Sequence, residues 1–319
     1  MSIQSMAEQE FTASAAAKHS GVSPVSKRNQ MLLDAYYMIE QEDARAAGTV
    51  GYMGRILVQA TLPHKDPKLP PGQMYSRTTG LATLNIVPTS RKYGIPFGTL
   101  PRILLAWICT EAVRTQCHTL ELGRSQAEFM KKLQLHGGGS DVARFREQAM
   151  RLFRSLISID RDDDDRDEAD RLMVSDQDKI FWHKDPNVQS LWQSELKLTD
   201  KFFKEVTNRP VPLDLRVMHA LSKAPLSMDI YTWLTYRMFV LRSTGRRSVD
   251  IPWVGLVDQI GAGYANTAEG LRAFRYYFRE RLKEVLLFYP DAAKHVEDTG
   301  TCLRITPAPL HLPAHNPLR

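Results

Sequence analysis

Residues 266–286 restrict the possible fold more than any other stretch of this sequence, because apolar and basic residues recur there with the spacing of one helix. An α-helix places residues three or four apart on the same side. Asn266 and Glu269 form a capping-box pattern at the start. We therefore predict a helix that buries an apolar stripe in a core; the stripe consists of Leu271, Phe274, Phe278, Leu282 and Val285.

A basic stripe follows the same predicted helix on the adjoining face and consists of Arg272, Arg275, Arg279 and Lys283. Cations held in a row on a rigid helix suit the phosphates of a polyanion. Solvated surface arginines give the same pattern, so the helix alone leaves both interpretations open.

The composition is that of a globular protein with an uneven charge. The chain has 319 residues, of which 43% are hydrophobic, and a net charge of +6. This length allows one large core or two cores of ordinary size. Residues 160–178 hold ten carboxylates against three arginines, a local charge of −7 that leaves +13 for the remainder. Such a balance favours nucleic acid as the first partner and an anionic membrane as the second.

The three cysteines, Cys109, Cys117 and Cys302, form no CxxC pair. We therefore expect neither a disulfide framework nor a common zinc spacing, and a reducing cytoplasm fits. The longest apolar run, residues 103–109, is far shorter than the roughly 20 residues that cross a bilayer, and the polar N-terminus lacks a secretory apolar region. We expect a cytoplasmic protein without a membrane-spanning segment.

The first half of the sequence predicts helices followed by a strand hairpin. Apolar spacing, capping residues and glycines place the elements after a mobile tail. In chain order they are a helix over 28–46, strands over 54–62 and 75–87, a helix over 99–115, a strand over 119–122, helices over 125–135 and 140–156, and strands over 156–159 and 172–182 that flank the acidic run. The expected first residues or caps of the helices are Thr99, Ser125 and Ser140.

The second half repeats this order. Its predicted elements are helices over 213–221 and 228–241, the latter capped by Ser227, a short helix from Asp250, the basic helix, and strands over 294–297 and 302–306. Both halves thus show helix, helix, turn, helix and hairpin, the plan of a winged helix-turn-helix domain. We predict an α+β, helix-rich fold with tandem winged helix-turn-helix domains.

The predicted domain boundaries follow from this repeat. They are an N-terminal tail and helix over 1–47, a first winged-helix domain over 48–190, a linker over 191–209, a second winged-helix domain over 210–307 and a C-terminal tail over 308–319.

In a winged helix, the last helix of the triad enters the major groove, and the hairpin touches the backbone or the adjacent minor groove. Arg144 and Arg151 share one flank of the first such helix, and the basic stripe lines the second. Arg246 and Arg247, just before the Asp250 helix, add backbone contacts or form a solvated turn. We predict binding of double-stranded DNA at two consecutive grooves, with an affinity that falls steeply with salt.

No motif for catalysis or nucleotide binding stands out. The sequence lacks GxxxxGK[ST], and Asp162–Asp165 lack the alternating ligands and glycine turn of a calcium loop. Tyr276 and Tyr277 suggest a strand-nicking nucleophile, but the closely spaced histidine pair that such an enzyme needs is absent. His311 and His315 lie among prolines, which makes a helical metal site unfavourable. We expect no enzymatic activity, metal or cofactor. We expect the acidic run to be a solvated loop that either points away from the duplex or contacts a basic protein partner.

Several stretches together carry a family resemblance. They are Leu84-Asn-Ile-Val-Pro-Thr, Gly94-Ile-Pro-Phe-Gly-Thr-Leu-Pro-Arg, Pro212-Leu-Asp-Leu, Ser227-Met-Asp-Ile-Tyr-Thr-Trp-Leu-Thr-Tyr-Arg, Ile251-Pro-Trp and Arg275-Tyr-Tyr-Phe. In these stretches the chain resembles the plasmid-encoded RepA replication initiators of broad-host-range bacterial plasmids. The similarity covers about residues 51–307.

This resemblance implies a non-catalytic initiator, associated with the bacterial nucleoid and plasmid, that binds direct repeats at the plasmid origin. It implies opening of an adjacent AT-rich stretch and recruitment of the host replication initiator and helicase. It also implies monomers on the repeats and a homodimer that represses its own gene. The first winged helix then forms the dimer interface and contacts the DNA backbone, and the second is the main reader of origin DNA.

Three other functions remain open. A winged-helix transcriptional repressor needs only the same DNA-binding surface, and failure to sustain a plasmid that carries the origin favours it. A rolling-circle nicking protein, disfavoured by the missing histidine pair, nicks supercoiled origin DNA with magnesium. A protein-interaction module with incidental basic charge binds no DNA even at low salt.

Overall fold

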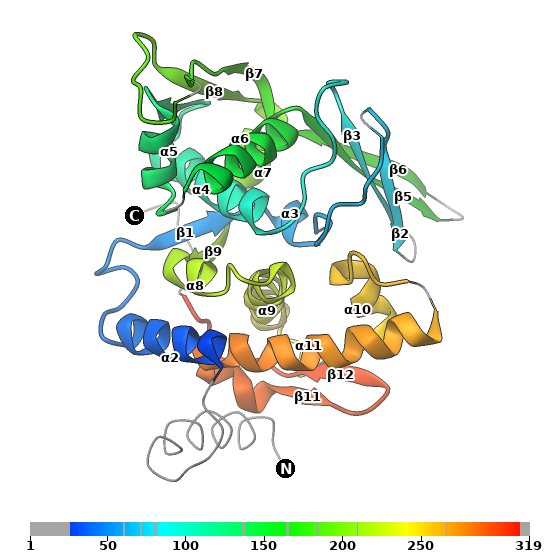
Figure 1. Ribbon diagram of the computed structural model, residues 1–319. Helices are drawn as coiled ribbons and strands as arrows, with labels where there is room; N and C mark the ends of the chain where they lie inside the picture. The colour runs from blue at the N-terminus through cyan, green and yellow to red at the C-terminus, as the bar shows by residue number, and fades with distance from the viewer. Residues whose placement is uncertain are drawn as a thin grey trace. The chain divides into compact units, whose positions relative to one another are not determined.

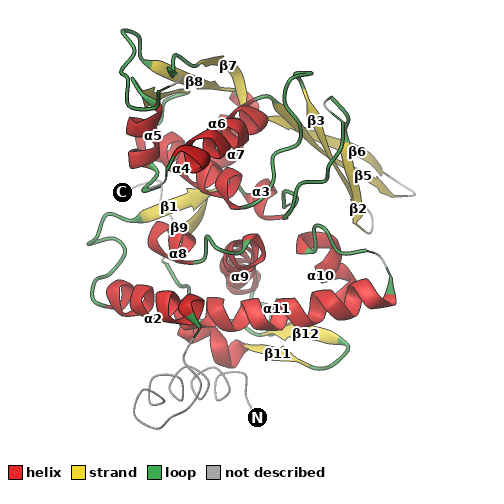
Figure 2. Cartoon of the chain, in the orientation of Figure 1, coloured by secondary structure: helices red, strands yellow, loops and turns green. Residues whose placement is uncertain are grey.

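The computed structural model describes residues 26–312 except 60, 71, 80–81, 136–137, 164–165, 184, 209 and 266. The chain divides into two compact units, which we call the terminal unit (residues 1–51 and 211–319) and the central unit (residues 52–210). Figure 1 labels their helices and strands, and Figure 2 separates the two kinds of element by colour. With 48% helix and 20% strand, the structure confirms the α+β class.

The terminal unit is built from both ends of the chain. Its elements are α2 (Lys27–Glu40), β9 (Val211–Asp214), α8 (Leu215–Ala220), α9 (Pro225–Thr244), β10 (Val249–Pro252), α10 (Trp253–Ile260), α11 (Ala268–Phe288), the 3-10 helix η2 (Pro290–His295), β11 (Val296–Asp298) and β12 (Cys302–Ile305). The chain leaves this unit within β1 (Val50–Met53). Three antiparallel strands form a sheet in the order β10-β12-β11.

The core of the terminal unit confirms the apolar stripe of the predicted helix 266–286. Phe274, Phe278, Leu282 and Val285 of α11 are buried, and Leu271 is half-buried. The rings of Phe274 and Phe278 meet Trp253 of α10 at centroid distances of 6.4 and 5.4 Å in edge-on geometry. Aromatic pairs of this kind add to the free energy gained from apolar burial. They fix α10 against α11.

The central unit has more strands. Its elements are α3 (Arg55–Gln59), β2 (Tyr75–Thr79), β3 (Ala82–Pro88), α4 (Thr99–Thr115), β4 (Thr119–Gly123), α5 (Gln126–Lys132), α6 (Gly139–Phe153), β5 (Ser155–Asp163), β6 (Arg166–Met173), β7 (Ser175–Lys179), β8 (Ser194–Leu198) and α7 (Asp200–Asn208). They form two antiparallel sheets in the orders β2-β3-β5-β6 and β4-β8-β7.

The strands predicted from the first half need three corrections. Residues 54–62 contain the helix α3, because a short apolar run fits a buried helix as well as a strand. The Ile56 amide also donates to the Glu205 carboxylate, which caps the helix start. Residues 75–87 form a hairpin of two strands. The stretch 172–182 is divided between β6 and β7, which lie in different sheets.

The predicted linker 191–209 and C-terminal tail 308–319 also differ from the structure. Strand β8 and helix α7 occupy most of the linker, and Phe202 and Val206 of α7 are fully buried. In the tail, Ala308 and Leu312 are buried in the terminal unit. The N-terminal helix belongs to the terminal unit as well. It therefore shares a unit with elements near the other end of the chain, which domains drawn as consecutive segments of the sequence do not predict.

The expected helix caps are partly confirmed. Ser125 accepts a hydrogen bond from the Glu128 amide at 3.1 Å and caps α5. The caps of α4 and α6 are Gly98 and Gly138, one or two residues before the predicted ones.

Two further helices have cap residues other than the predicted ones. Helix α9 begins with Pro225 after the cap residue Ala224, which frees the Ser227 hydroxyl to bind Glu284. Helix α11 is capped by Thr267, whose side chain accepts from the Gly270 amide. Asn266, the predicted cap, lies outside the described residues.

Candidate nucleic-acid interface

Arg272 and Lys283 of the basic stripe have different surroundings. The Arg272 side chain is 69% exposed and forms an ion pair of 3.0 Å with Glu269, one helical turn away. Lys283 is mostly covered and lies 3.2 Å from a Glu280 oxygen. Exposed ion pairs within one helix contribute little to stability. The arginine of such a pair can therefore leave its glutamate for another anion. Arg272 is therefore the more accessible of the two cations.

Arg275 and Arg279 link α11 to the hairpin that joins β11 and β12. Arg275 Nη2 donates to the Gly300 carbonyl at 2.5 Å, and Arg279 Nε donates to Asp298 Oδ2 at 2.5 Å. Both guanidinium groups also lie over the Trp253 ring, at 5.1 and 5.8 Å from its centroid. Such contacts combine hydrogen bonding with cation–π attraction. These two arginines thus hold the hairpin beside the helix as well as adding positive charge to it.

Tyr276 lies on the surface of α11 beside the basic stripe, although its sequence context suggested only a strand-nicking nucleophile. It lies four residues after Arg272 and three before Arg279, and it is 62% exposed. Its neighbour Tyr277 is about half-exposed, and the two rings are 5.3 Å apart. Helical spacing from the arginines was the signal that would have placed Tyr276 on the basic face.

Arg246 and Arg247 follow the end of α9, where Gly245 takes the left-handed conformation with φ of 65°. A glycine suits this position because it carries no Cβ. Both arginines are exposed, and neither side chain has a hydrogen-bond or ion-pair partner among the described residues. They remain predicted phosphate contacts.

Arg144 and Arg151 share helix α6 but differ in exposure. Arg144 is largely exposed, with Asp141 at 3.6 Å. Arg151 is only 15% exposed; it donates to the Ile95 carbonyl at 2.9 Å and to Glu147 at 2.6 Å. The Arg151 guanidinium therefore has a structural partner on each side, which leaves little of it for a phosphate.

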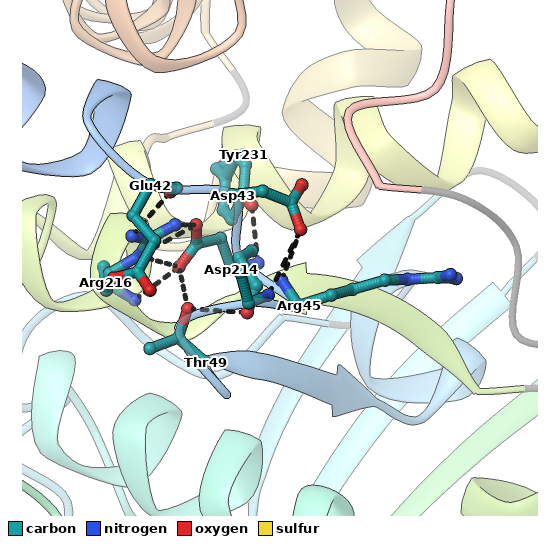
Figure 3. Close-up of polar contacts among 9 residues, drawn as sticks. Glu42, Asp43, Arg45, Thr49, Asp214, Arg216 and Tyr231 are labelled. Atoms are coloured by element: carbon teal, nitrogen blue, oxygen red, sulfur yellow. Dashed lines mark hydrogen bonds and ion pairs between the residues drawn. The ribbon is translucent and has the colours of Figure 1, made fainter.

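A separate polar network surrounds Asp214 at the start of α8 (Figure 3). Its buried carboxylate pairs with Arg216 at 2.7 Å and accepts from the Thr49 hydroxyl at 3.3 Å. The Asp214 amide donates to the Tyr231 hydroxyl at 2.9 Å, and Arg216 donates to the Glu42 carbonyl at 3.0 Å. The hydrogen bond to Asp214 raises the pKa of Arg216, and burial raises that of Tyr231. This network joins the N-terminal segment to α8 and α9.

Within the described residues, no group of three or more His, Cys, Asp or Glu side chains could hold a metal ion. Burial raises the pKa of the Cys109 thiol to about 12, so little thiolate forms there at neutral pH. In the same part of the chain, no helix combines the length and apolarity needed to cross a membrane. Residues 164–165 of the acidic run, and the side chains of 161–170, lie outside the description.

Two units, one with a partly exposed cationic helix tied to a hairpin, define an α+β protein. The chain belongs to the family described as plasmid-encoded RepA protein, whose family model matches residues 95–254, half of the sequence. This match confirms the resemblance found in the sequence. No curated protein matches the chain.

Solved structures of domains 2 and 3 of RctB are similar to this chain. One, a selenomethionine derivative, has a TM-score of 0.49 at 11% identity, and another has a TM-score of 0.45 at 13% identity. Each alignment covers 80% of this chain and 96% of the RctB chain.

Proposed function

We propose that this protein initiates replication of the plasmid that encodes it by binding double-stranded DNA at the origin. Membership of the plasmid-encoded RepA family supports the initiator role. The cationic surface of α11 supports DNA as the ligand, because phosphate contacts supply most of the non-specific affinity of DNA-binding proteins.

Each unit acts in this proposal as a winged helix-turn-helix. In the terminal unit, α9, β10, α10, α11, β11 and β12 follow one another, with only the short 3-10 helix η2 between α11 and β11, and the strand order is β10-β12-β11. In the central unit, α4, β4, α5, α6, β7 and β8 do the same with the order β4-β8-β7, once the β5–β6 hairpin is set aside as an insertion. The same succession of elements and the same strand order in both units support this interpretation.

The observation that carries the proposal is the exposed face of α11 beside its hairpin. Arg272 and Tyr276 face solvent, and Arg279 keeps about half of its side chain exposed while it holds Asp298. A helix in the major groove can direct such side chains at base edges and phosphates. The tethered hairpin would then contact the adjacent backbone or minor groove. Arg275 and Arg279 position that hairpin, and Arg272 and Tyr276 read the DNA.

The finer parts of the role follow from this binding. The protein recognises direct repeats, helps to open an AT-rich stretch and recruits the host initiator and helicase in the bacterial cytoplasm. It does so without a catalytic step of its own. A homodimer formed through the central unit represses its gene, and this autorepression needs only the same DNA-binding surface.

Footprinting on the plasmid's own origin tests the proposal. We expect protection of direct repeats near the gene. Replacing Arg272 and Tyr276 with alanine should weaken this binding by about 1–3 kcal/mol per contact, and replacing Arg275 and Arg279 with alanine should weaken it as well, because the hairpin is then no longer held beside α11. Lys223→Ala is the matched control, because this exposed lysine lies outside α11 and its hairpin. Protection confined to unrelated sequence contradicts the proposal. Repeat protection without plasmid maintenance would point to a repressor instead.

A further inference from the structure

The loop between β7 and β8, residues 180–193, carries two exposed apolar side chains in sequence. Leu191 is 92% exposed and Trp192 67%. The loop occupies the position of the wing if the central unit is a winged helix (Figure 1). Isolated apolar residues on a surface are common, but an adjacent leucine and tryptophan with this exposure at a hairpin loop indicate a contact surface.

The base of this loop is anchored in the core of the central unit. Trp182 is buried, and its ring lies 5.6 Å from that of Phe129 on α5 and 6.0 Å from that of Phe145 on α6. The Phe181 amide donates to the Ser194 hydroxyl at 3.0 Å across the base of the hairpin. One tryptophan of the loop therefore fixes it to the helices, and the other faces solvent.

Hydrogen bonds from backbone amides and from one arginine side chain hold further residues of the loop near α5 and α6. The Ala127 amide donates to the Pro186 carbonyl at 3.0 Å, and the Ser190 amide donates to the Arg124 carbonyl at 2.9 Å. The Arg146 guanidinium of α6 donates to the carbonyls of residues 182 and 183 at 3.2 and 3.3 Å. The residues immediately before Leu191 are thus held by hydrogen bonds. The exposure of Leu191 and Trp192 is therefore not explained by a loop without contacts to the rest of the unit.

Positive charge accompanies this apolar pair. Arg124 and Arg146 have no carboxylate partner for their guanidinium groups among the described residues. Of the nearby carboxylates, Glu195 pairs with Lys179 at 3.8 Å, whereas Glu121 and Asp185 accept from neutral amides, those of Gln193 at 3.1 Å and Asn187 at 3.0 Å. An apolar tip beside Arg124 and Arg146, whose positive charges have no carboxylate partner among the described residues, matches a polyanion with an apolar interior, which describes duplex DNA better than an apolar protein groove.

We propose that Leu191 and Trp192 form a wedge that enters the minor groove and separates a base step. This inference rests on the proposed function, since it requires the central unit to bind DNA. Apolar side chains inserted between bases unstack them and kink the duplex by roughly 20–90°. Pyrimidine–purine steps such as TA deform most easily. The wedge thus gives the protein a direct means of weakening an AT-rich stretch.

Tryptophan fluorescence provides a direct test. Of the five tryptophans, Trp182, Trp233 and Trp253 are buried and Trp107 is partly buried, so Trp192 dominates the fraction accessible to acrylamide. The probe is a duplex that carries the plasmid's own origin with its AT-rich stretch. We expect saturating DNA to protect this fraction from acrylamide, and Trp192→Phe to remove both the accessible fraction and its protection. Unchanged accessibility on fully bound DNA would overturn the wedge.

Permanganate oxidation of unstacked thymines gives a second readout that does not depend on fluorescence. The double variant Leu191→Ala, Trp192→Ala should still bind at low salt, within several-fold of the wild type, but should lose most of the thymine reactivity. Val188→Ala is the matched control, because it is another exposed apolar residue of the same loop. Equal reactivity in the double variant and the wild type contradicts the wedge.

Two further outcomes distinguish the possible failures. If wild-type protein binds no origin DNA even at low salt, the proposed function fails and the wedge fails with it. If Trp192 stays accessible on DNA but becomes protected when the host helicase is added, the loop is a protein-docking surface and the wedge is wrong.

Discussion

We expect replacement of Glu284 by alanine to destabilise the terminal unit by about 2–4 kcal/mol, because this buried carboxylate holds three elements together. Its side chain is 8% exposed. Arg28 of α2 donates to it through Nε and Nη2, each at 2.7 Å, Arg281 donates at 2.5 Å, and the Ser227 hydroxyl of α9 donates at 2.7 Å. Breaking a buried charge pair costs about 3–5 kcal/mol. The two arginines are partly exposed and can be rehydrated, which lowers the expected cost to about 2–4 kcal/mol.

Arg28→Ala separates the contribution of α2 from that of the whole network. Glu284 then keeps Arg281 and Ser227, so we expect a smaller loss of about 1–2 kcal/mol and faster amide exchange confined to α2. Glu280→Ala is the matched control on the same helix. Its pair with Lys283 is exposed on the glutamate side, and we expect a change within about 1 kcal/mol.

Urea unfolding followed by circular dichroism measures these differences, and hydrogen exchange locates them. Two outcomes would refute the reasoning. One is a Glu284→Ala variant within about 0.5 kcal/mol of the wild type. The other is an Arg28→Ala variant that loses as much stability as Glu284→Ala, since that would leave Arg281 and Ser227 without a role.

Three further predictions concern single residues. Burial lowers the pKa of His311 from its usual 6.5, so the unfolded chain binds more protons and the free energy of unfolding should fall as the pH drops below about 6.5. His311→Gln should make the free energy of unfolding depend less on pH in this range than it does in the wild type. Identical pH dependence of the two proteins would contradict this prediction. Arg151→Ala should cost about 1–3 kcal/mol of stability, whereas Arg144→Ala should leave stability unchanged and reduce the salt slope of DNA binding by about 1. Urea midpoints and gel-shift titrations of the two variants test this difference. A stable Arg151→Ala variant together with a destabilised Arg144→Ala variant would contradict it. Ser125→Ala should destabilise the central unit by about 1 kcal/mol through loss of the α5 cap, and an unchanged urea midpoint would show that the hydroxyl adds nothing.

The sequence predicted the helices best where apolar spacing was long and regular. The stripe from Phe274 to Val285 extends over three turns and only a helix can bury it on one side, so α11 was found with its end within two residues. The run over 54–62 was too short to distinguish helix from strand, and α3 was missed. The shared core of the two chain ends depends on contacts between residues more than 160 apart, such as Thr49 with Asp214, which periodicity does not report.

The sequence shows which residues of the candidate interface carry charge, but it does not show which partners their side chains contact. Spacing alone placed Arg272, Arg275 and Arg279 on one side of α11, but it could not show that Gly300 and Asp298 of the hairpin take up two of the three guanidinium groups. Arg151 was assigned to a flank that the fold covers with Ile95 and Phe97. Partners brought by tertiary structure decide which cations stay available, and one helix in isolation carries no information about them.

The salt dependence of origin binding shows whether the arginines of α11 contact DNA phosphates. Each phosphate contact contributes about −0.9 to the slope of log K against log salt. We therefore predict a steep slope for the wild type, and a slope less steep by about 1 for the triple variant in which Arg272, Arg275 and Arg279 are alanine, because the hairpin already takes up the guanidinium groups of Arg275 and Arg279. Equal slopes and equal affinities in a triple variant shown to be folded would contradict the role of α11 in gripping DNA.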